Sequence, residues 1–138
     1  MSAAGKRYAR AAVEAAFGNG GVDSVQALSE GLGQFREAYG ASDELREVLG
    51  NPALKDVREP VLRAVLTKLG ASTETTNLVL VLAENDRIAA LDDVAQDINR
   101  IADEKAGRLR AVVKTAIELS TEQENRIAKA LEKRLGQP

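Results

Sequence analysis

Apolar residues recur at the three- and four-residue spacing of an amphipathic helix over most of the chain, so the sequence predicts a mainly α-helical fold. Stretches that contain glycine or proline separate the first five periodic segments, as is typical of helix ends. We therefore expect an N-terminal six-helix bundle. Its helices cover about residues 3–17, 24–39, 42–49, 56–69, 73–83 and 86–105.

Local signals mark the ends of these helices. The run Gly18-Asn19-Gly20-Gly21 predicts a stop after the first helix, and Gly70 predicts a stop after the fourth. Ser42 is expected to cap the third helix, and the fifth is expected to begin after Ser72. The fourth helix is expected to open with Asp56-Val57-Arg58-Glu59, a capping box in which Asp replaces Ser or Thr.

The fifth and sixth segments have contrasting patterns. Residues 78–83 are all apolar, which also suits a buried strand, but the polar lead-in at 73–77 and the segment length favour a helix. The sixth segment is apolar on one side, and its other side is expected to form a solvated face. That face consists of Asp92, Asp93, Gln96, Asp97, Arg100 and Asp103.

The pattern changes after Gly107. Apolar residues and Thr115 then alternate from Leu109 to Ile117, which predicts a strand. A capping box at residues 120–123 predicts one further helix. A lone strand leaves its backbone groups unpaired on both edges. We therefore expect residues 1–106 to form the six-helix bundle. Residues 107–138 are expected to be the truncated start of a small α/β module, with one strand and one helix.

The first and fifth helices carry more apolar surface than one core needs. The apolar arc of the first helix covers about 200° at 100° per residue, whereas a helix lying on one core needs an apolar face of ~100° or somewhat more. The excess predicts burial on a second side, with Tyr8 as an aromatic anchor. Two such helices side by side would form a groove for an amphipathic helix. The alternative stays open, because Ala is the best helix former and an all-apolar helix can be the centre of a bundle.

Composition narrows the classes of function. The chain has no Cys and no His, which excludes thiol and imidazole chemistry, and no metal or cofactor motif is present. The net charge of −2 argues against nucleic acid as a partner, although Lys6, Arg7 and Arg10 form a small basic patch. No apolar run approaches the ~20 residues that cross a bilayer, so we expect no direct membrane insertion.

Four motifs carry a resemblance to a known family. They are Tyr8-Ala9-Arg10-Ala11-Ala12, Leu49-Gly50-Asn51-Pro52, the segment 82–88 (LAENDRI) and the segment 115–120 (TAIELS). In this order they resemble the delta subunit of F-type ATP synthase, the family of the mitochondrial oligomycin-sensitivity-conferring protein. The resemblance implies a six-helix bundle followed by a C-terminal α/β module, and the end of that module is expected to be missing here.

The resemblance also implies a role and partners. It implies a non-catalytic stator subunit that joins the catalytic head to the peripheral stalk, resists rotor torque during proton-driven ATP synthesis and is not a homo-oligomer. Its place would be the cytoplasmic face of the bacterial plasma membrane, held there through the complex. The alternative is an all-helical adaptor or a nucleic-acid-binding factor.

The implied contacts fall on residues of this chain. The N-terminal helix of an alpha subunit would lie between the first and fifth helices, and the b subunits would contact the last helix. The residues implied for the alpha-subunit helix are Tyr8, Ala11, Ala12, Ala15, Asn77, Leu78, Val81 and Leu82. Those implied for the b subunits are Ile127 and Leu131.

Overall fold

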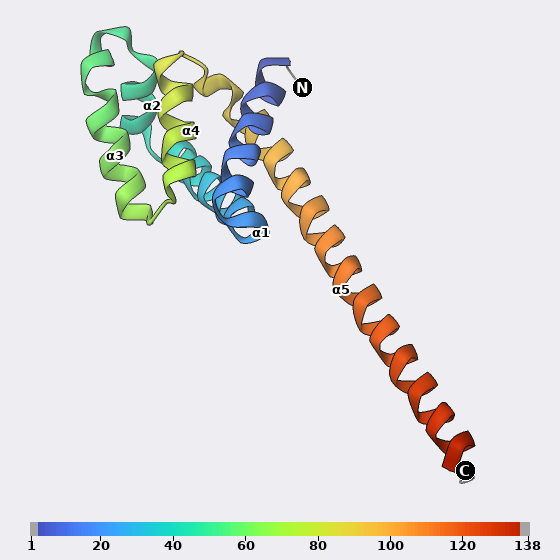
Figure 1. Ribbon diagram of the computed structural model, residues 1–138. Coiled ribbons are helices and arrows are strands. Elements are labelled where there is room, and N and C mark those ends of the chain that lie inside the picture. Colours follow the sequence, from blue (N-terminus) through green and yellow to red (C-terminus); the bar gives the residue numbers. More distant parts are fainter. Residues whose placement is uncertain (1–2, 136–138) are drawn as a thin grey trace. The chain divides into compact units, whose positions relative to one another are not determined.

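The computed structural model describes residues 3–135 and is helical, with no strand among these residues (Figure 1). Residues 1–2 and 136–138, at the ends of the two expected domains, lie outside the described part. The elements in chain order are α1 (Ala3–Ala41), α2 (Asp43–Gly50), the 3-10 helix η1 (Pro52–Val57), α3 (Arg58–Leu69), α4 (Thr73–Glu84), the 3-10 helix η2 (Ile88–Ala90) and α5 (Leu91–Leu135).

The chain divides into two units, of which the first ends at Asp103 and the second begins at Glu104. The domain boundary that the sequence suggests after residue 106 stays a prediction. The first unit holds the core, which is built from aliphatic side chains and one aromatic ring. Its largest fully buried members include Phe35, Leu28, Leu32, Leu62, Leu66, Leu82 and Ile98.

The first two expected helices are joined in α1. The interruption lies where the glycine run predicted it, because Gly20 and Gly21 leave helical geometry. Gly21 has a φ of 68°, a left-handed conformation that glycine adopts without the steric cost of a Cβ atom. The structure has five α-helices within residues 3–135, so a bundle of six separate helices is not confirmed.

Most of the predicted helix ends are confirmed. The side chains of Ser42 and Ser72 accept hydrogen bonds from Leu45 N and Thr75 N and so cap α2 and α4. Gly70 ends α3 with a φ of 70°.

The predicted capping box at the start of the fourth helix is wrong. Asp56 lies inside η1, and Val57 is the N-cap of α3, with no side-chain capping bond. The Asn51 side chain accepts a hydrogen bond from Ala53 N and starts η1, so α3 begins only at Arg58. A local turn ahead of the helix therefore displaced the expected start.

The strand predicted from Leu109 to Ile117 is also wrong, because these residues belong to α5. A helix satisfies its backbone hydrogen bonds internally, whereas a strand needs a partner strand, and residues 3–135 supply none. The expected one-strand module is therefore not confirmed. The expected helix start at residues 120–123 also lies inside α5, where Thr121 Oγ1 donates to the carbonyl of Ile117 at 3.1 Å.

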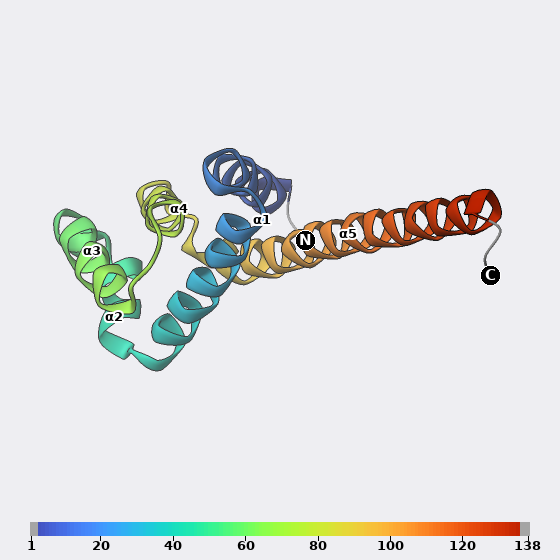
Figure 2. The ribbon, with the colours of Figure 1, turned by 60° about the horizontal axis from the view of Figure 1, so that its bottom comes forward.

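The apolar run at 78–83 is confirmed as helical, since it lies within α4. α4 packs against both α1 and α3 (Figure 2), which explains why its apolar residues face several directions. On α5, Asp97 differs from its expected place on a solvated face, because only 6% of it is exposed. Its carboxylate accepts a hydrogen bond from Arg100 at 2.8 Å, which offsets part of the cost of burying the charge. Within residues 3–135, no helix combines the length and apolar character needed to cross a membrane.

Candidate functional site

A groove with a volume of about 250 Å³ runs between the first half of α1 and α4. Its floor and walls are mainly small or apolar side chains. The lining residues are Tyr8, Ala11, Ala12, Ala15 and Asn19 from α1, and Thr73, Glu74, Asn77, Leu78 and Val81 from α4.

The first half of α1 has two apolar sides. Ala9, Val13 and Ala16 are buried in the core, whereas Ala11 and Ala15 are exposed and line the groove. This is the second apolar side that the wide arc in the sequence predicted. Methyl side chains on that side let another helix approach α1 closely, because interaxial distance depends on side-chain size at the contact.

Polar links join α1 and α4 at both ends of the groove. The Asn19 side-chain amide donates to Glu74 Oε1 at 2.7 Å, and the Asn85 side-chain amide donates to the Tyr8 hydroxyl at 3.2 Å. Because each bond pairs one end of this half of α1 with the opposite end of α4, the two helices run antiparallel. The hydrogen bond from Asn19 is the main reason why the pKa of Glu74 lies below its ordinary value, so this carboxylate is charged at neutral pH.

The second half of α1 holds α4 at close range. Gly31 faces Thr75, and a Cβ atom added at Gly31 would lie only 2.7 Å from Thr75 Oγ1. Thr75 is fully buried, and its hydroxyl is hydrogen-bonded to Ser72 Oγ at 3.0 Å. The position of α4, and with it one wall of the groove, is thus set by close packing at a glycine.

All of the groove residues expected from the sequence line this groove except Leu82. Leu82 is completely buried and supports the groove from the core side. The sequence did not identify Asn19, Thr73 and Glu74 as groove residues. A helical repeat could have found them, because Asn19 lies one turn beyond Ala15 and the other two lie one turn before Asn77. Whether the lining residues contact a partner stays a prediction.

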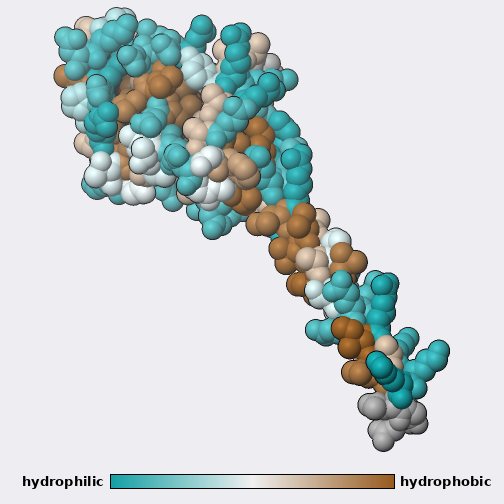
Figure 3. All heavy atoms as spheres, in the orientation of Figure 1, coloured by the Kyte–Doolittle hydropathy of each residue, from teal (hydrophilic) through white to brown (hydrophobic). Residues whose placement is uncertain are grey.

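The two residues expected to contact b subunits lie in the second unit. Ile127 and Leu131 are 61% and 53% exposed and are four residues apart, so they share one face of α5. Figure 3 shows hydrophobic surface along this helix. Their part in binding also stays a prediction.

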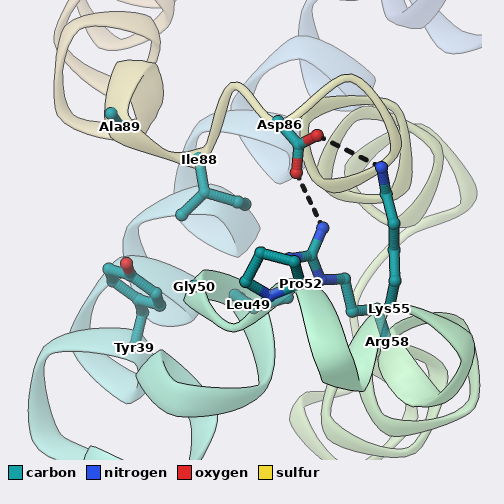
Figure 4. Close-up of a pocket in the computed structure, with 9 residues that line it drawn as sticks. All are labelled: Tyr39, Leu49, Gly50, Pro52, Lys55, Arg58, Asp86, Ile88 and Ala89. Carbon is teal, nitrogen blue, oxygen red and sulfur yellow. Dashed lines mark hydrogen bonds and ion pairs between the residues drawn. The ribbon is translucent and has the colours of Figure 1, made fainter.

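A second hollow of about 380 Å³ is built around a buried arginine (Figure 4). Arg58, only 6% exposed, donates to the carbonyl of Val48 at 3.1 Å, to that of Asn51 at 3.4 Å and to Asp86 Oδ1 at 2.7 Å. Lys55 Nζ lies 3.4 Å from the other carboxylate oxygen of Asp86. These contacts join η1 and the end of α2 to the turn after α4. Nothing in the sequence indicates that Arg58 is buried.

Asp86 has the conformation and the charge that this cluster requires. Its φ of 53° is left-handed, which is uncommon for a residue with a side chain. The hydrogen bond from Arg58, followed by that from Lys55, holds the pKa of Asp86 below its ordinary value. The arrangement fixes a turn, and within residues 3–135 no three or more His, Cys, Asp or Glu side chains are grouped so that they could hold a metal ion.

Comparison with known proteins assigns the chain to a family. The family model described as "ATP synthase delta (OSCP) subunit" matches residues 4–138. The chain belongs to this family. ATP synthase subunit delta of Trichlorobacter lovleyi is 29% identical over 136 residues, which cover 98% of this chain and 74% of the relative. The same subunit of Brevibacillus brevis is 35% identical over 127 residues, which cover 92% of this chain and 71% of the relative. No solved structure gives a significant match.

In this delta-family chain, three of the motifs quoted above meet around one turn. Tyr8, from the first motif, accepts a hydrogen bond from Asn85 of the third. Asp86 of the third motif pairs with Arg58, which also donates to Asn51 of the second. The turn after α4 thus connects the Arg58 cluster to one end of the groove.

Proposed function

We propose that this chain is a non-catalytic stator subunit of an F-type ATP synthase that joins the catalytic head to the peripheral stalk and resists rotor torque. The groove between α1 and α4 is the observation that carries the proposal. Membership of the delta family indicates that the complex is an ATP synthase. In this groove the N-terminal helix of an alpha subunit would lie against Tyr8, the alanines of α1 and Val81. The subunit itself would lie at the cytoplasmic face of the bacterial plasma membrane, held there by the complex.

The groove has the dimensions and chemistry of a helix site. From Tyr8 to Asn19 it follows α1 for about 16 Å at 1.5 Å per residue, which is three helical turns. Its apolar surface remains exposed in the free chain, as the 40% exposure of Val81 shows. Apolar surface buried by a helix in the groove would raise its affinity. The gain would appear mostly as slower dissociation, because affinity differences between related complexes lie mostly in the dissociation rate.

A second attachment would hold the joint under load. We assign contact with the b subunits to the exposed face of α5 that carries Ile127 and Leu131. Two attachments within one assembly raise the effective concentration at each site. The joint would then hold against torque even when one contact opens briefly.

Val81→Asp tests the groove. Covering the remaining 40% of Val81 contributes about 1 kcal/mol to binding, and burying a carboxylate in its place costs at least about 1–3 kcal/mol more. We expect the affinity for a synthetic peptide of the alpha-subunit N-terminus to fall by at least about 30-fold, which corresponds to ~2 kcal/mol. Isothermal titration measures this change, and circular dichroism checks that helicity is retained.

Val57→Asp is the matched control. Val57 is 43% exposed, slightly more than Val81, but it lies at the N-cap of α3 and does not line the groove. It is expected to leave the affinity unchanged. Equal affinities for the two variants, with both folded, would rule out the groove as the binding site.

A further inference from the structure

A further hollow, distinct from the one around Arg58, adjoins the groove at the Tyr8 end. This hollow has a volume of about 400 Å³ and is lined by Ala4, Arg7, Tyr8, Ala11 and Arg87. Tyr8 and Ala11 line both the groove and this hollow, so the two lie next to each other along α1, and we refer to them together as the channel. From Ala4 to Asn19 the channel follows about 22 Å of helix, which matches a partner of about 15 residues.

The two ends of this channel carry opposite charges. At one end stand Arg7 and Arg87, and neither guanidinium has an ion-pair partner among residues 3–135. At the other end stands Glu74, whose carboxylate accepts a hydrogen bond from the neutral Asn19 amide and forms no ion pair with a described residue. Two unneutralised cations and one anion thus face the ends of the same apolar floor.

The backbone does not cancel this polarity. α4 and the first half of α1 are antiparallel, so each end of the channel has the N-terminus of one helix beside the C-terminus of the other. Their macrodipoles oppose each other at both ends. The charged side chains therefore set the direction of the field along the channel.

We propose that the channel binds an amphipathic helix in one orientation only, with an acidic end over Arg7 and Arg87 and a basic end over Glu74. The proposal rests on the proposed function and adds the charge pattern of the partner. Apolar contact with Ala11, Ala15 and Val81 supplies affinity without direction. Charge complementarity supplies the direction, as it commonly does at protein interfaces.

Two synthetic 15-residue Ala/Leu helices test the proposal with the full chain at low salt. The polar peptide carries two Glu in one terminal turn and two Lys in the other, and the mixed peptide carries one Glu and one Lys in each. Replacement of both arginines, Arg7→Gln with Arg87→Gln, is expected to weaken the polar peptide about fivefold, since each exposed ion pair contributes about a twofold effect or somewhat more. The mixed peptide is expected to change less than twofold.

Two controls complete the affinity measurement. Arg10→Gln with Arg108→Gln removes the same charge from exposed positions outside both hollows and is expected to affect neither peptide. Because each peptide is compared with itself across variants, a difference in peptide helicity does not enter the result. Salt is expected to reduce the arginine effect.

Spin labels give the orientation directly, since the chain has no cysteine of its own. A nitroxide on Lys6→Cys should broaden the proton resonances of the acidic end of the polar peptide. A nitroxide on Gly18→Cys, where a new Cβ meets open space, should broaden those of the basic end. The reverse pattern, equal broadening at both ends or equal arginine effects on the two peptides would overturn the orientation while leaving the groove intact. Failure of both peptides to bind would overturn the groove as well.

Discussion

Replacing Gly31 with Ala is expected to destabilise the first unit, although Ala is the better helix former. A Cβ atom at this position would lie 2.7 Å from Thr75 Oγ1, 3.1 Å from its Cγ2 and 3.3 Å from its Cβ. Thr75 has no free space to move into, because it is fully buried and bonded to Ser72. The new methyl group must therefore push α1 and α4 apart or break the hydrogen bond between Thr75 and Ser72.

The magnitude follows from two opposing effects. Replacing Gly by Ala inside a helix gains about 1 kcal/mol of helix propensity. Overpacking a closely fitted site costs about 1–3 kcal/mol, and losing a buried hydrogen bond costs about 1–3 kcal/mol. We expect the free energy of unfolding to fall by about 2 kcal/mol. Urea unfolding followed by circular dichroism measures it, since the chain has no tryptophan.

Gly33→Ala is the matched control, two residues further along α1. Nothing lies within 4 Å of a Cβ atom there, so only helix propensity acts and the variant is expected to gain up to about 1 kcal/mol. The effect of Gly31→Ala is also expected to shrink in a Thr75→Ala background, which removes both of the closest atoms. If Gly31→Ala is as stable as Gly33→Ala, the close approach of α1 and α4 does not hold.

Three further substitutions test the turn and cap interactions. Arg58→Met is expected to lower the free energy of unfolding by about 2–3 kcal/mol, because it removes the buried guanidinium that donates to two carbonyls and to Asp86. A loss below 1 kcal/mol in urea unfolding would speak against the buried cluster. Asp86→Asn is expected to flatten stability against pH in acid. The depressed pKa of Asp86 stabilises the fold at neutral pH, and this contribution is lost as the pH falls below the ordinary value of 3.8. An acid unfolding curve identical to that of the parent chain would contradict this. Gly70→Ala is expected to cost about 1 kcal/mol or more, because the φ of 70° strains a residue with a Cβ atom, whereas Gly40→Ala is expected to cost nothing. Equal melting temperatures would refute the difference.

Part of the candidate site could be predicted because its signal lies on one helix at a time. The alanine-rich arc of residues 3–17 exceeds what one core can cover, and the structure indeed buries Ala9 and Ala16 while exposing Ala11 and Ala15. The continuous apolar run of α4 does not indicate which of its residues face the core. Leu82 and Val81 are neighbours of similar character, yet Leu82 is buried and Val81 is 40% exposed. Only the placement of α1 and α3 against α4 separates them.

The sequence by itself determined four of the helix boundaries, because caps and left-handed glycines act over a few residues. Ser42, Ser72, Gly70 and the break at Gly20 and Gly21 were all predicted where the structure has them. Tertiary structure decided whether residues 109–117 form a strand and which charged side chains are buried, because both depend on other parts of the chain. Residues 109–117 alternate like a strand, but residues 3–135 contain no strand for them to pair with, and their backbone forms the hydrogen bonds of a helix. Arg58 and Asp97 look like surface residues in the sequence and are buried in the fold. A charged side chain becomes buried only where the folded chain brings it a partner, and the pairing of Arg58 with Asp86 joins positions 28 residues apart.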